Sequence, residues 1–294
     1  MKILTYILAV LLSTAFTVDA KTKVVASTAD LAWFAEVIGG DLVDVDAIAA
    51  PDADIHFVEV RPSYMMKLAK ADVALKVGLE LDLWMDKLID GSRNGKLQVV
   101  DCSKYVKPLE VPSFEADARY GDLHRYGNPH YWIGPQNVEA ITDAIVEGLS
   151  DADPSNAEVY SQHQAAYLEQ LNRDLEQLKP ETDKLKGQQV VFYHNSWPYF
   201  CQYTGLEAAG FVEAYPGVPP SPSHIKEMID LVAKRKVKVI AIEPYFDPRV
   251  PKKIAEASGA TVIKLYPSIG GRHDHESYTD WLKGNLDALK EALK

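Results

Sequence analysis

Strand-like runs alternate with segments of helical period along most of this chain. In the first half the strand-like runs cover residues 23–27, 43–49, 73–77 and 97–100. After residue 188 the alternation starts again, with runs at residues 189–193, 237–242 and 261–265. The segments that we expect to be helical are residues 30–38, 62–71, 81–88, 135–149, 199–204, 223–234, 251–258 and 278–293. Strands that alternate with helices predict an α/β fold, in which helices flank a mostly parallel sheet.

The clearest helical period lies in the middle of the chain, at residues 156–178. Its apolar positions are Val159, Ala166, Leu168, Leu171, Leu175 and Leu178. Their spacing, mostly three or four residues, predicts one helix, which begins near Asp153-Pro154 and has Pro180 at or just past its end. About 25 helical residues would span about 38 Å. We therefore expect this helix to join two lobes as a stiff backbone.

The length of the chain supports two lobes. About 270 residues follow the first 20, which exceeds the usual size of a single hydrophobic core. The predicted parts are a signal peptide at residues 1–20, an N-terminal α/β lobe at 21–152, the linking helix at 153–186 and a C-terminal α/β lobe at 187–294.

The first 20 residues have the pattern of a signal peptide. Lys2 supplies a positive charge, residues 3–16 are apolar but short for a bilayer span, and Val18-Asp19-Ala20 fits a cleavage site. Cleavage would release a soluble exported protein, most simply a periplasmic one; an uncleaved membrane anchor is the alternative. Because no later stretch is apolar enough for a transmembrane helix, we expect no stable membrane insertion.

The net charge and the two cysteines bear on the possible binding partners and on a possible disulfide bond. A formal net charge of −11 argues against binding to nucleic acids or anionic lipid surfaces. The two cysteines, Cys102 and Cys201, could pair in an oxidising compartment and restrain the lobes. They could equally remain two separate buried thiols, and the sequence leaves this open.

Three histidines occur in short segments that we interpret as loop edges, beside turn residues and aromatics: His56, His130 and His194. Neutral imidazole is the commonest metal ligand among side chains. Three imidazoles that converge from separate elements would form a nitrogen-rich site suited to zinc.

The segments around these histidines, taken in order, resemble one family. The first is Ala53-Asp54-x-His56 with Glu59 and Pro62-Ser63 downstream, the second is Asn128-Pro129-His130-x-Trp132-x-x-Pro135, and the third is Tyr193-His194-x-x-Trp197-x-Tyr199-Phe200. Pro220-Ser221-Pro222, Ile242-Glu243-Pro244 and Asn285-x-x-x-Leu289 also fit. Together they resemble the solute-binding proteins of ABC transporters for zinc and manganese, over nearly the whole chain after residue 20.

The resemblance implies two α/β lobes joined by one long helix, with a metal held in the cleft between them. It implies that His56, His130 and His194 bind the metal, and that the protein is a monomer that delivers Zn²⁺ to an ABC permease. Three-histidine members of the family tend to bind zinc, whereas manganese members tend to have a carboxylate in the third position, so Mn²⁺ and Fe²⁺ are secondary candidates. A single helical connection further predicts small lobe movements during binding and release.

The fourth ligand position departs from the family pattern. Many relatives have a Leu-Asp-Pro segment where this chain has Leu265-Tyr266-Pro267. Tyrosine has an ordinary pKa near 10, so Tyr266 is a poor ligand, and we expect it to pack over the cleft. The possible replacements are Glu243 as ligand or as a partner that orients a histidine, Asp247, the region of Asp274, or water.

Other functions compete with metal delivery. A manganese or iron(II) carrier would keep the same fold, and an adhesin or metal-storage protein would keep the binding but lack the permease. A zinc-dependent hydrolase could use an open three-histidine site, since zinc lowers the pKa of bound water to about 7. Because the chain has neither a His-Glu-x-x-His nor a Gly-x-Ser-x-Gly motif, we predict that it is not an enzyme.

Three further histidines give weaker signals. His124 lies in a segment that we interpret as an irregular surface loop. His273 and His275 could bind a second metal weakly, or they could belong to a solvated polar loop.

Overall fold

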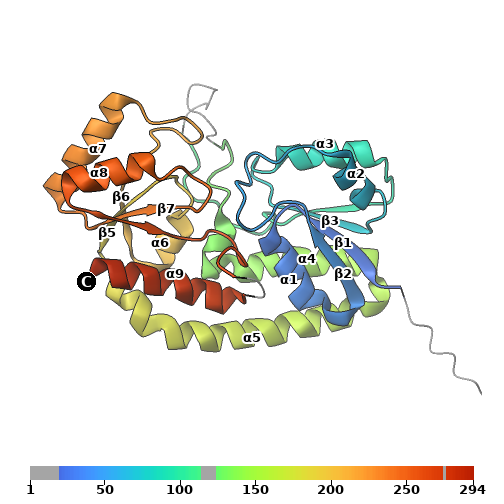
Figure 1. Ribbon diagram of the computed structural model, residues 1–294. Helices are drawn as coiled ribbons and strands as arrows, with labels where there is room; N and C mark the ends of the chain where they lie inside the picture. The colour runs from blue at the N-terminus through green and yellow to red at the C-terminus, as the bar shows by residue number, and fades with distance from the viewer. Residues whose placement is uncertain (1–19, 114–123, 274–275) are drawn as a thin grey trace, which may run out of the picture.

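The computed structural model describes residues 20–113, 124–273 and 276–294, and in it two α/β lobes lie side by side above one long helix (Figure 1). The first lobe has a parallel sheet of order β2-β1-β3-β4, and the second has a parallel sheet of order β6-β5-β7-β8. The strands of the first lobe are β1 (Thr22–Ala26), β2 (Val43–Ala47), β3 (Val73–Lys76) and β4 (Gln98–Asp101). Those of the second are β5 (Gln189–Phe192), β6 (Glu207–Phe211), β7 (Val239–Ile242) and β8 (Thr261–Lys264). The predicted fold class is confirmed.

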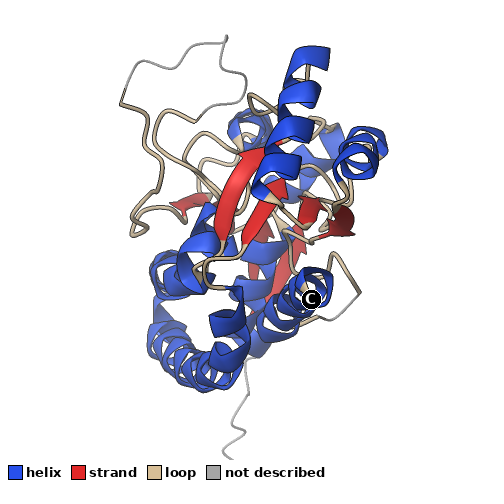
Figure 2. Ribbon diagram, turned by 90° about the vertical axis from the view of Figure 1, so that its left-hand side faces the viewer, coloured by secondary structure: helices blue, strands red, loops and turns tan. Residues whose placement is uncertain are grey.

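Helices cover both faces of each sheet, and Figure 2 shows the strands between helices above and below. The helices are α1 (Ala29–Gly39), α2 (Pro62–Leu68), α3 (Leu83–Ser92), α4 (Val138–Ala152), α5 (Ala157–Thr182), α6 (Pro198–Thr204), α7 (Pro222–Arg235), α8 (Arg249–Ser258) and α9 (Tyr278–Leu293). In β1, Val24 packs into one apolar cluster and its neighbour Val25 into another. Because successive strand residues point to opposite faces, both faces of this sheet are buried, as is usual for parallel sheets.

The largest apolar cluster extends through both lobes. Val24 and Ile145 of the first lobe belong to it, as do Phe192 and Leu286 of the second lobe and Leu171 of α5. Helix α5 passes beneath both lobes and packs against α1 and α4 of the first and α9 of the second (Figure 1). The two lobes therefore share buried apolar surface in addition to one chain connection.

Helix α5 has 26 residues and continues past the proline at which we expected it to stop. Pro180 lies within its last turn, at an exposed position. The backbone N–H of Asp183 still donates to the carbonyl of Lys179, and the hydroxyl of Thr182 donates to the same carbonyl at 2.9 Å. The N–H that Pro180 lacks would have paired with the carbonyl of Glu176, and at this exposed end of the helix that carbonyl faces solvent.

Helix α3 also runs further than predicted, through Gly91 to Ser92. A Cβ at Gly91 would lie 2.7 Å from the sulfur of Met65, so glycine lets the Met65 side chain of α2 lie close against α3. The residue that ends the helix is Arg93, at a left-handed φ of 54°.

One strand, β6, lies where we did not predict one. Its sequence Glu-Ala-Ala-Gly-Phe has no run of β-branched residues, it lies at an edge of its sheet, and its pairing with β5 is irregular after Val190.

Cys102 and Cys201 are free thiols. Of the predicted signal peptide, residues 1–19 are outside the described residues. Within the described part of the chain, none of the helices combines the length and the apolarity that a membrane span requires.

Candidate metal centre

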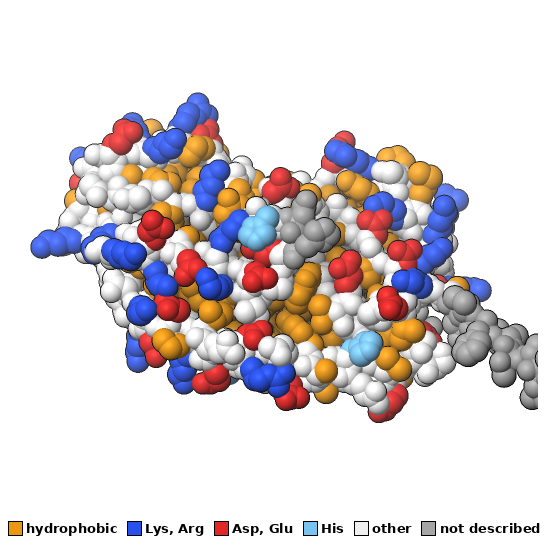
Figure 3. Space-filling model, turned by 60° about the horizontal axis from the view of Figure 1, so that its bottom comes forward, with side chains coloured by type: hydrophobic (Ala, Val, Ile, Leu, Met, Phe, Trp, Pro, Cys, Tyr) orange, Lys and Arg blue, Asp and Glu red, His pale blue; other side chains and the backbone are white. Residues whose placement is uncertain are grey.

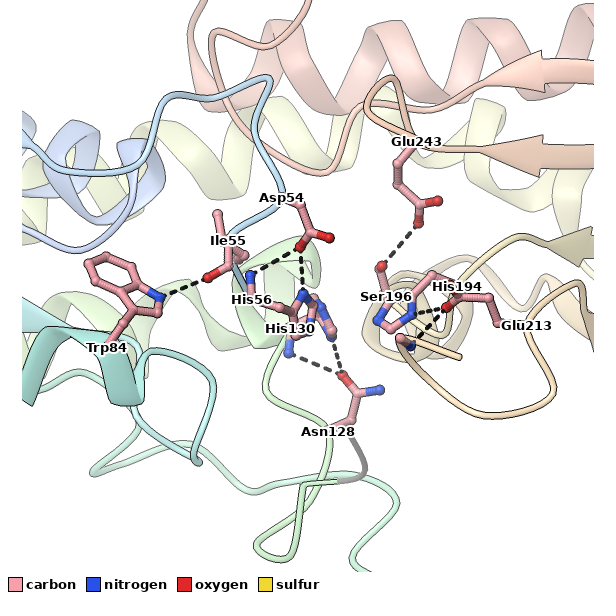
Figure 4. A network of polar contacts seen from close by, with 11 residues as sticks. Asp54, Ile55, His56, Trp84, Asn128, His130, His194, Ser196, Glu213 and Glu243 are labelled. Atoms are coloured by element: carbon pink, nitrogen blue, oxygen red, sulfur yellow. Dashed lines mark hydrogen bonds and ion pairs between the residues drawn. The ribbon is translucent and has the colours of Figure 1, made fainter. Parts of the chain in front are cut away.

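His56, His130 and His194 meet between the two lobes (Figure 4). One ring nitrogen from each lies within 4.8 Å of the other two. The ring centroids are 5.1 to 5.4 Å apart, and the residues His130 and His194 are 3% and 4% exposed. The structure thus brings together three histidines that the sequence separates by 74 and 64 positions.

Each histidine reaches the centre from the carboxyl end of a strand or from an anchored loop. His194 lies two residues after β5, and His56 lies in the loop between β2 and α2. That loop is fixed by Trp84 of α3, whose indole Nε1 donates to the carbonyl of Ile55 at 2.9 Å. His130 immediately precedes the 3₁₀ turn of residues 131–133. Since ligands of open α/β sheets bind beyond the carboxyl ends of the strands, the location is the expected one.

The Nδ1 atom of every ring lies within hydrogen-bond distance of a side-chain oxygen. The partners are Asp54 Oδ1 at 2.9 Å from His56, Asn128 Oδ1 at 3.0 Å from His130, and Glu213 Oε2 at 2.9 Å from His194. Because a carboxylate only accepts, Nδ1 carries the proton in His56 and His194, and the lone pair is on Nε2. Oxygen partners of this kind orient histidines that bind metals through the other nitrogen.

The side chain of Asn128 is itself held in the orientation that His130 needs. Its amide nitrogen donates to the carbonyl of Asn195 at 2.8 Å and to the carboxylate of Glu110 at 3.1 Å. The amide oxygen therefore faces His130 and accepts the Nδ1 proton. In all three rings Nε2 thus carries the lone pair that can bind a metal.

The Nε2 atoms of His56 and His130 are buried and have no hydrogen-bond partner. Buried polar atoms without partners are rare, and each one calls for an explanation such as an ion. Two such atoms, on rings whose other nitrogen is already engaged, fit a divalent metal that accepts nitrogen lone pairs.

The electrostatic setting favours the neutral form of the His130 and His194 rings. Burial, followed by the neighbouring His56 and His194, holds the pKa of His130 well below its ordinary value. Burial also lowers the pKa of His194, although the hydrogen bond from its ring to Glu213 opposes the shift. Burial works to raise the pKa of Asp54, but its hydrogen bonds with the side chain and the backbone N–H of His56 help to lower the pKa overall. Neutral imidazole is the form that binds metal.

The cavity at this centre, lined in part by His130 and His194, has a volume of about 40 Å³. A water molecule in the liquid occupies about 30 Å³, whereas pockets for organic ligands have about 300–1,000 Å³. The cavity therefore suits an ion and is too small for an organic substrate.

On the face of the molecule seen in Figure 3, the described basic side chains are interspersed with acidic ones rather than gathered into one patch.

Glu243, which we predicted as a fourth ligand or an orienting partner, lies outside the three-histidine group in the described part of the chain. It follows β7, and its Oε1 accepts hydrogen bonds from Ser196 Oγ at 3.0 Å and Trp197 Nε1 at 2.9 Å (Figure 4). Burial raises its pKa to about 7, although these two donors oppose the shift. Oε1 of Glu243 therefore holds the segment that follows His194, whereas its Oε2 is buried without a hydrogen-bond partner, and its role at the metal stays a prediction.

Of the other predicted replacements, Asp247 also lies outside the three-histidine group in the described part of the chain. The backbone N–H of Tyr266 donates to Asn285 Oδ1 at 3.0 Å, and its ring lies 5.1 Å from the guanidinium of Arg272. Asp247 is exposed and paired with Arg249. Asp274 and His275 are outside the described residues. His273 is exposed, with Nε2 3.9 Å from the carboxylate of Glu276.

A functional residue that we did not predict is Glu213, the hydrogen-bond partner of His194. Phe192 of β5 lies opposite Phe211 of β6, so the residues two positions further along, His194 and Glu213, emerge level with each other. The backbone N–H of Glu213 donates to the carbonyl of Tyr193 at 3.0 Å and continues the ladder. No local pattern marks Glu213, because strand β6 before it has no run of β-branched residues.

A local signal was available for the other two partners. Asp54 and Asn128 each lie two residues before a histidine, and the same side-chain oxygen accepts both the backbone N–H and the ring of that histidine. The backbone contacts are 3.0 Å at His56 and 3.1 Å at His130. Asx side chains commonly form this bond two residues on, so Asx-x-His predicts an oriented histidine.

Comparison with known proteins places these observations in context. The model of the family described as "Zinc-uptake complex component A periplasmic" (ZnuA) matches residues 24–292. The solved structure described as the crystal structure of ZnuA superposes with a TM-score of 0.81 at 25% identity, covering 94% of this chain and all of that one. A Mn-bound periplasmic metal binding protein from Candidatus Liberibacter asiaticus shares the fold, with a TM-score of 0.75 at 22% identity over 93% of this chain and all of that one.

Curated relatives carry the names of different metals. The iron-binding protein YfeA of Yersinia pestis is 24% identical over 242 residues, which cover 82% of this chain and 75% of YfeA. The manganese ABC transporter substrate-binding lipoprotein PsaA of Streptococcus pneumoniae is 25% identical over 286 residues, or 93% of this chain and 89% of PsaA. The comparisons thus agree on metal binding and differ on the metal.

Proposed function

Because this chain belongs to the ZnuA family of periplasmic metal-binding proteins, which serve ABC transporters as substrate-binding proteins and are not enzymes, we propose that its cargo is Zn²⁺ and that it delivers the ion to a membrane permease. His56, His130 and His194 are the proposed ligands. We further propose that the protein acts as a monomer in the periplasm after removal of residues 1–20.

The observation that carries the choice of zinc is the donor set. The only group of three or more potential ligands that lie close together within the described ranges consists of three imidazoles, without a carboxylate. Imidazole nitrogen suits zinc, whereas manganese prefers carboxylate, carbonyl and water oxygens. The carboxylates of Asp54 and Glu213 are already engaged by the Nδ1 atoms of the histidines.

A manganese or iron(II) carrier is the second candidate, since relatives named for manganese and iron share most of the length of this chain. The two candidates differ in which ion the isolated site prefers. A hydrolase is disfavoured by the family, since relatives are named as substrate-binding proteins of transporters.

The direct test is calorimetric titration of metal-stripped protein, lacking residues 1–20, with Zn²⁺ and separately with Mn²⁺ at pH 7.5. We expect one equivalent of Zn²⁺ to bind tightly and Mn²⁺ to bind at least about 100-fold more weakly, because all three proposed donors are nitrogen. Mn²⁺ binding that equals or exceeds Zn²⁺ binding would favour the second candidate. Absence of binding to either ion would overturn the proposal.

The affinity for zinc should change little as the pH falls from 7.5 to 6.0. In the metal-free protein the pKa values of His130 and His194 are lowered, so protons compete with zinc for these rings only at a pH below the ordinary value of 6.5. Three imidazoles with ordinary pKa values would together lose about 50-fold in affinity over this range, whereas we expect a loss below about fivefold. Titrations at pH 7.5, 6.5 and 6.0 in one ionic strength measure the difference; a 50-fold loss would contradict it.

A further inference from the structure

Two of the three histidines at the centre are bonded to a carboxylate, and the third is bonded to an amide. Nδ1 of His56 and Nδ1 of His194 each lie beside a carboxylate oxygen, whereas Nδ1 of His130 lies 3.0 Å from the amide oxygen of Asn128. A carboxylate that accepts the proton of a ligating imidazole makes the opposite nitrogen a stronger metal ligand. A carboxylate that serves His130 in this way would have to act through Asn128.

Glu110 is placed to do so. Its Oε2 accepts a hydrogen bond from the amide nitrogen of Asn128 at 3.1 Å, while the amide oxygen of Asn128 accepts the backbone N–H of His130 at 3.1 Å as well as the Nδ1 proton. Carboxylate, amide and imidazole thus form one line of hydrogen bonds. Bonds to an ionised acceptor are stronger than neutral ones, and hydrogen bonds in a chain polarise one another. The charge of Glu110 therefore strengthens the acceptor that faces His130.

The same oxygen of Glu110 also reaches the second lobe. The amide nitrogen of Asn195 donates to Oε2 at 2.8 Å, and Asn195 directly follows His194. The backbone carbonyl of Asn195 in turn accepts from the amide nitrogen of Asn128 at 2.8 Å. Glu110, Asn128 and Asn195 therefore form a closed group that joins the segment before His130 to the segment after His194.

The backbone beside Glu110 is fixed by the same two segments. The N–H of Asn128 donates to the carbonyl of Leu109 at 2.8 Å, and the N–H of Leu109 donates to the hydroxyl oxygen of Tyr199 at 3.0 Å. That hydroxyl donates to the carbonyl of Asn128 at 2.7 Å, and Tyr199, in α6 of the second lobe, is 1% exposed. The position of Glu110 is thus built into the contact between the lobes.

Glu110 has a left-handed φ of 55°. Glycine adopts this conformation readily, whereas a residue with a Cβ adopts it at a cost in free energy. Residues held in such conformations cluster at functional sites. Glu110 also lines the metal cavity, beside Asn128, His130 and His194. The backbone conformation and the hydrogen bonds together indicate that a carboxylate is needed at this place.

We propose that Glu110 is a positioning residue of the metal centre: through Asn128 it orients and polarises His130, and through Asn195 it holds the segment of His194 against it. This inference rests on the proposed function, since it names a residue that sets the affinity of the same site. Glu110 is not a ligand, because within the described ranges the group of close donors contains the three histidines alone. Each ligand ring then has a carboxylate behind it, two directly and one through an amide.

A double-mutant cycle tests whether Glu110 acts through Asn128. Glu110→Ala should lower the affinity for Zn²⁺ about tenfold, the lower end of the range for groups that orient ligating histidines, because Glu110 is exposed to water. Asn128→Ala should lower it roughly 30-fold, since Asn128 contacts the ring itself. In the Asn128→Ala background the change at Glu110 should cost less than about threefold, because the connection to His130 is already cut. Chelator competition at pH 7.5 measures all four affinities.

The control is Glu147→Ala, which changes the net charge equally. Glu147 is an exposed carboxylate of α4 that is paired with Lys104, away from the centre, so this variant should keep the affinity within about twofold. If Glu110→Ala fails to fold, Glu110→Gln takes its place in the cycle, since it keeps the size of the side chain and removes the charge.

Nuclear magnetic resonance of zinc-loaded protein with ¹⁵N-labelled histidine supplies a second readout. The Nδ1 proton of each bound ring gives a signal whose shift follows the strength of its hydrogen bond. We expect one of the three signals to move upfield in Glu110→Ala and all three to stay in place in Glu147→Ala. A residue that served only to pack would leave the Nδ1 signals unchanged, and that result would overturn the proposal.

The inference and the proposed function fail differently. Unchanged affinity in Glu110→Ala overturns the role of Glu110, and so does an equal loss in the presence and absence of the Asn128 side chain. In both cases zinc binding by the wild type leaves the proposed function standing. If the wild type binds no zinc, both are overturned.

Discussion

His130→Ala should lower the affinity for zinc by roughly 100-fold or more. Structural four-ligand zinc sites are worth about 10–16 kcal/mol, so one ligand accounts for about 3 kcal/mol, or a factor of about 100. His130 is 3% exposed, and its Nδ1 is engaged by Asn128, so removal of the ring also leaves a void and takes away one of the two hydrogen bonds that the amide oxygen of Asn128 accepts. Chelator competition at pH 7.5 measures the affinity. Near-ultraviolet circular dichroism of the metal-free variant reports whether the surrounding aromatics stay packed.

The control for this variant is His273→Ala, which removes an equal side chain from an exposed position away from the centre. It should retain the affinity of the wild type within about twofold, as surface substitutions usually have small effects. Equal affinities for the wild type and His130→Ala would show that the tight site lies elsewhere, for example in the loop that contains His273. That outcome would contradict the assignment of the three-histidine centre.

The sequence predicted the architecture because parallel α/β lobes have a strong local signature. Strands β3 and β5 lie in sheets that are buried on both faces, so these strands are short and apolar. The helices between the strands have one apolar face. Helix α5 was predictable because Leu171, Leu175 and Leu178 repeat at helical spacing against α1, α4 and α9. Signals of this kind are contained within a few turns of chain.

The environment of the centre was only partly predictable. The three histidines could be predicted because aromatics and turn residues mark their segments, and Asp54 and Asn128 lie within the same segments. Glu213 reaches His194 from a different strand, and its position depends on the register between β5 and β6, which no local pattern encodes. His124 likewise comes from a segment whose sequence is irregular, and only tertiary placement brings it to the cavity.

Glu243 could be named as a candidate from the sequence, but its hydrogen-bond partners could not be predicted. It occurs at the end of β7, where a ligand is plausible, and it is buried. Its Oε1, however, accepts hydrogen bonds from Ser196 and Trp197, two residues that follow His194 closely in sequence. A buried carboxylate of this kind positions a loop, and sequence alone does not separate that role from metal binding.

Trp132→Ala should lower the free energy of unfolding by about 3–5 kcal/mol, the usual cost of deleting a large aromatic side chain from a core. Trp132 is 1% exposed and belongs to the apolar cluster that both lobes share. Its indole Nε1 donates to the carbonyl of Pro267 in the second lobe at 2.9 Å, and its own carbonyl accepts from the hydroxyl of Tyr278 at 3.0 Å. The substitution therefore removes contacts between the lobes as well as buried area.

Urea unfolding of metal-free protein, followed by tryptophan-independent far-ultraviolet circular dichroism, measures this effect. Tyr126→Ala, at a residue that is 59% exposed, is the control and should change the free energy of unfolding by less than about 0.5 kcal/mol.

Because the lobes share a core, we expect the wild type to unfold in one transition and Trp132→Ala to approach two, as the lobes lose their coupling. A loss below about 1 kcal/mol with one unchanged transition would show that the lobes are held together elsewhere. The expected result instead supports metal release through loop rearrangement around His56 and His194, since lobes coupled so strongly resist wide hinge opening.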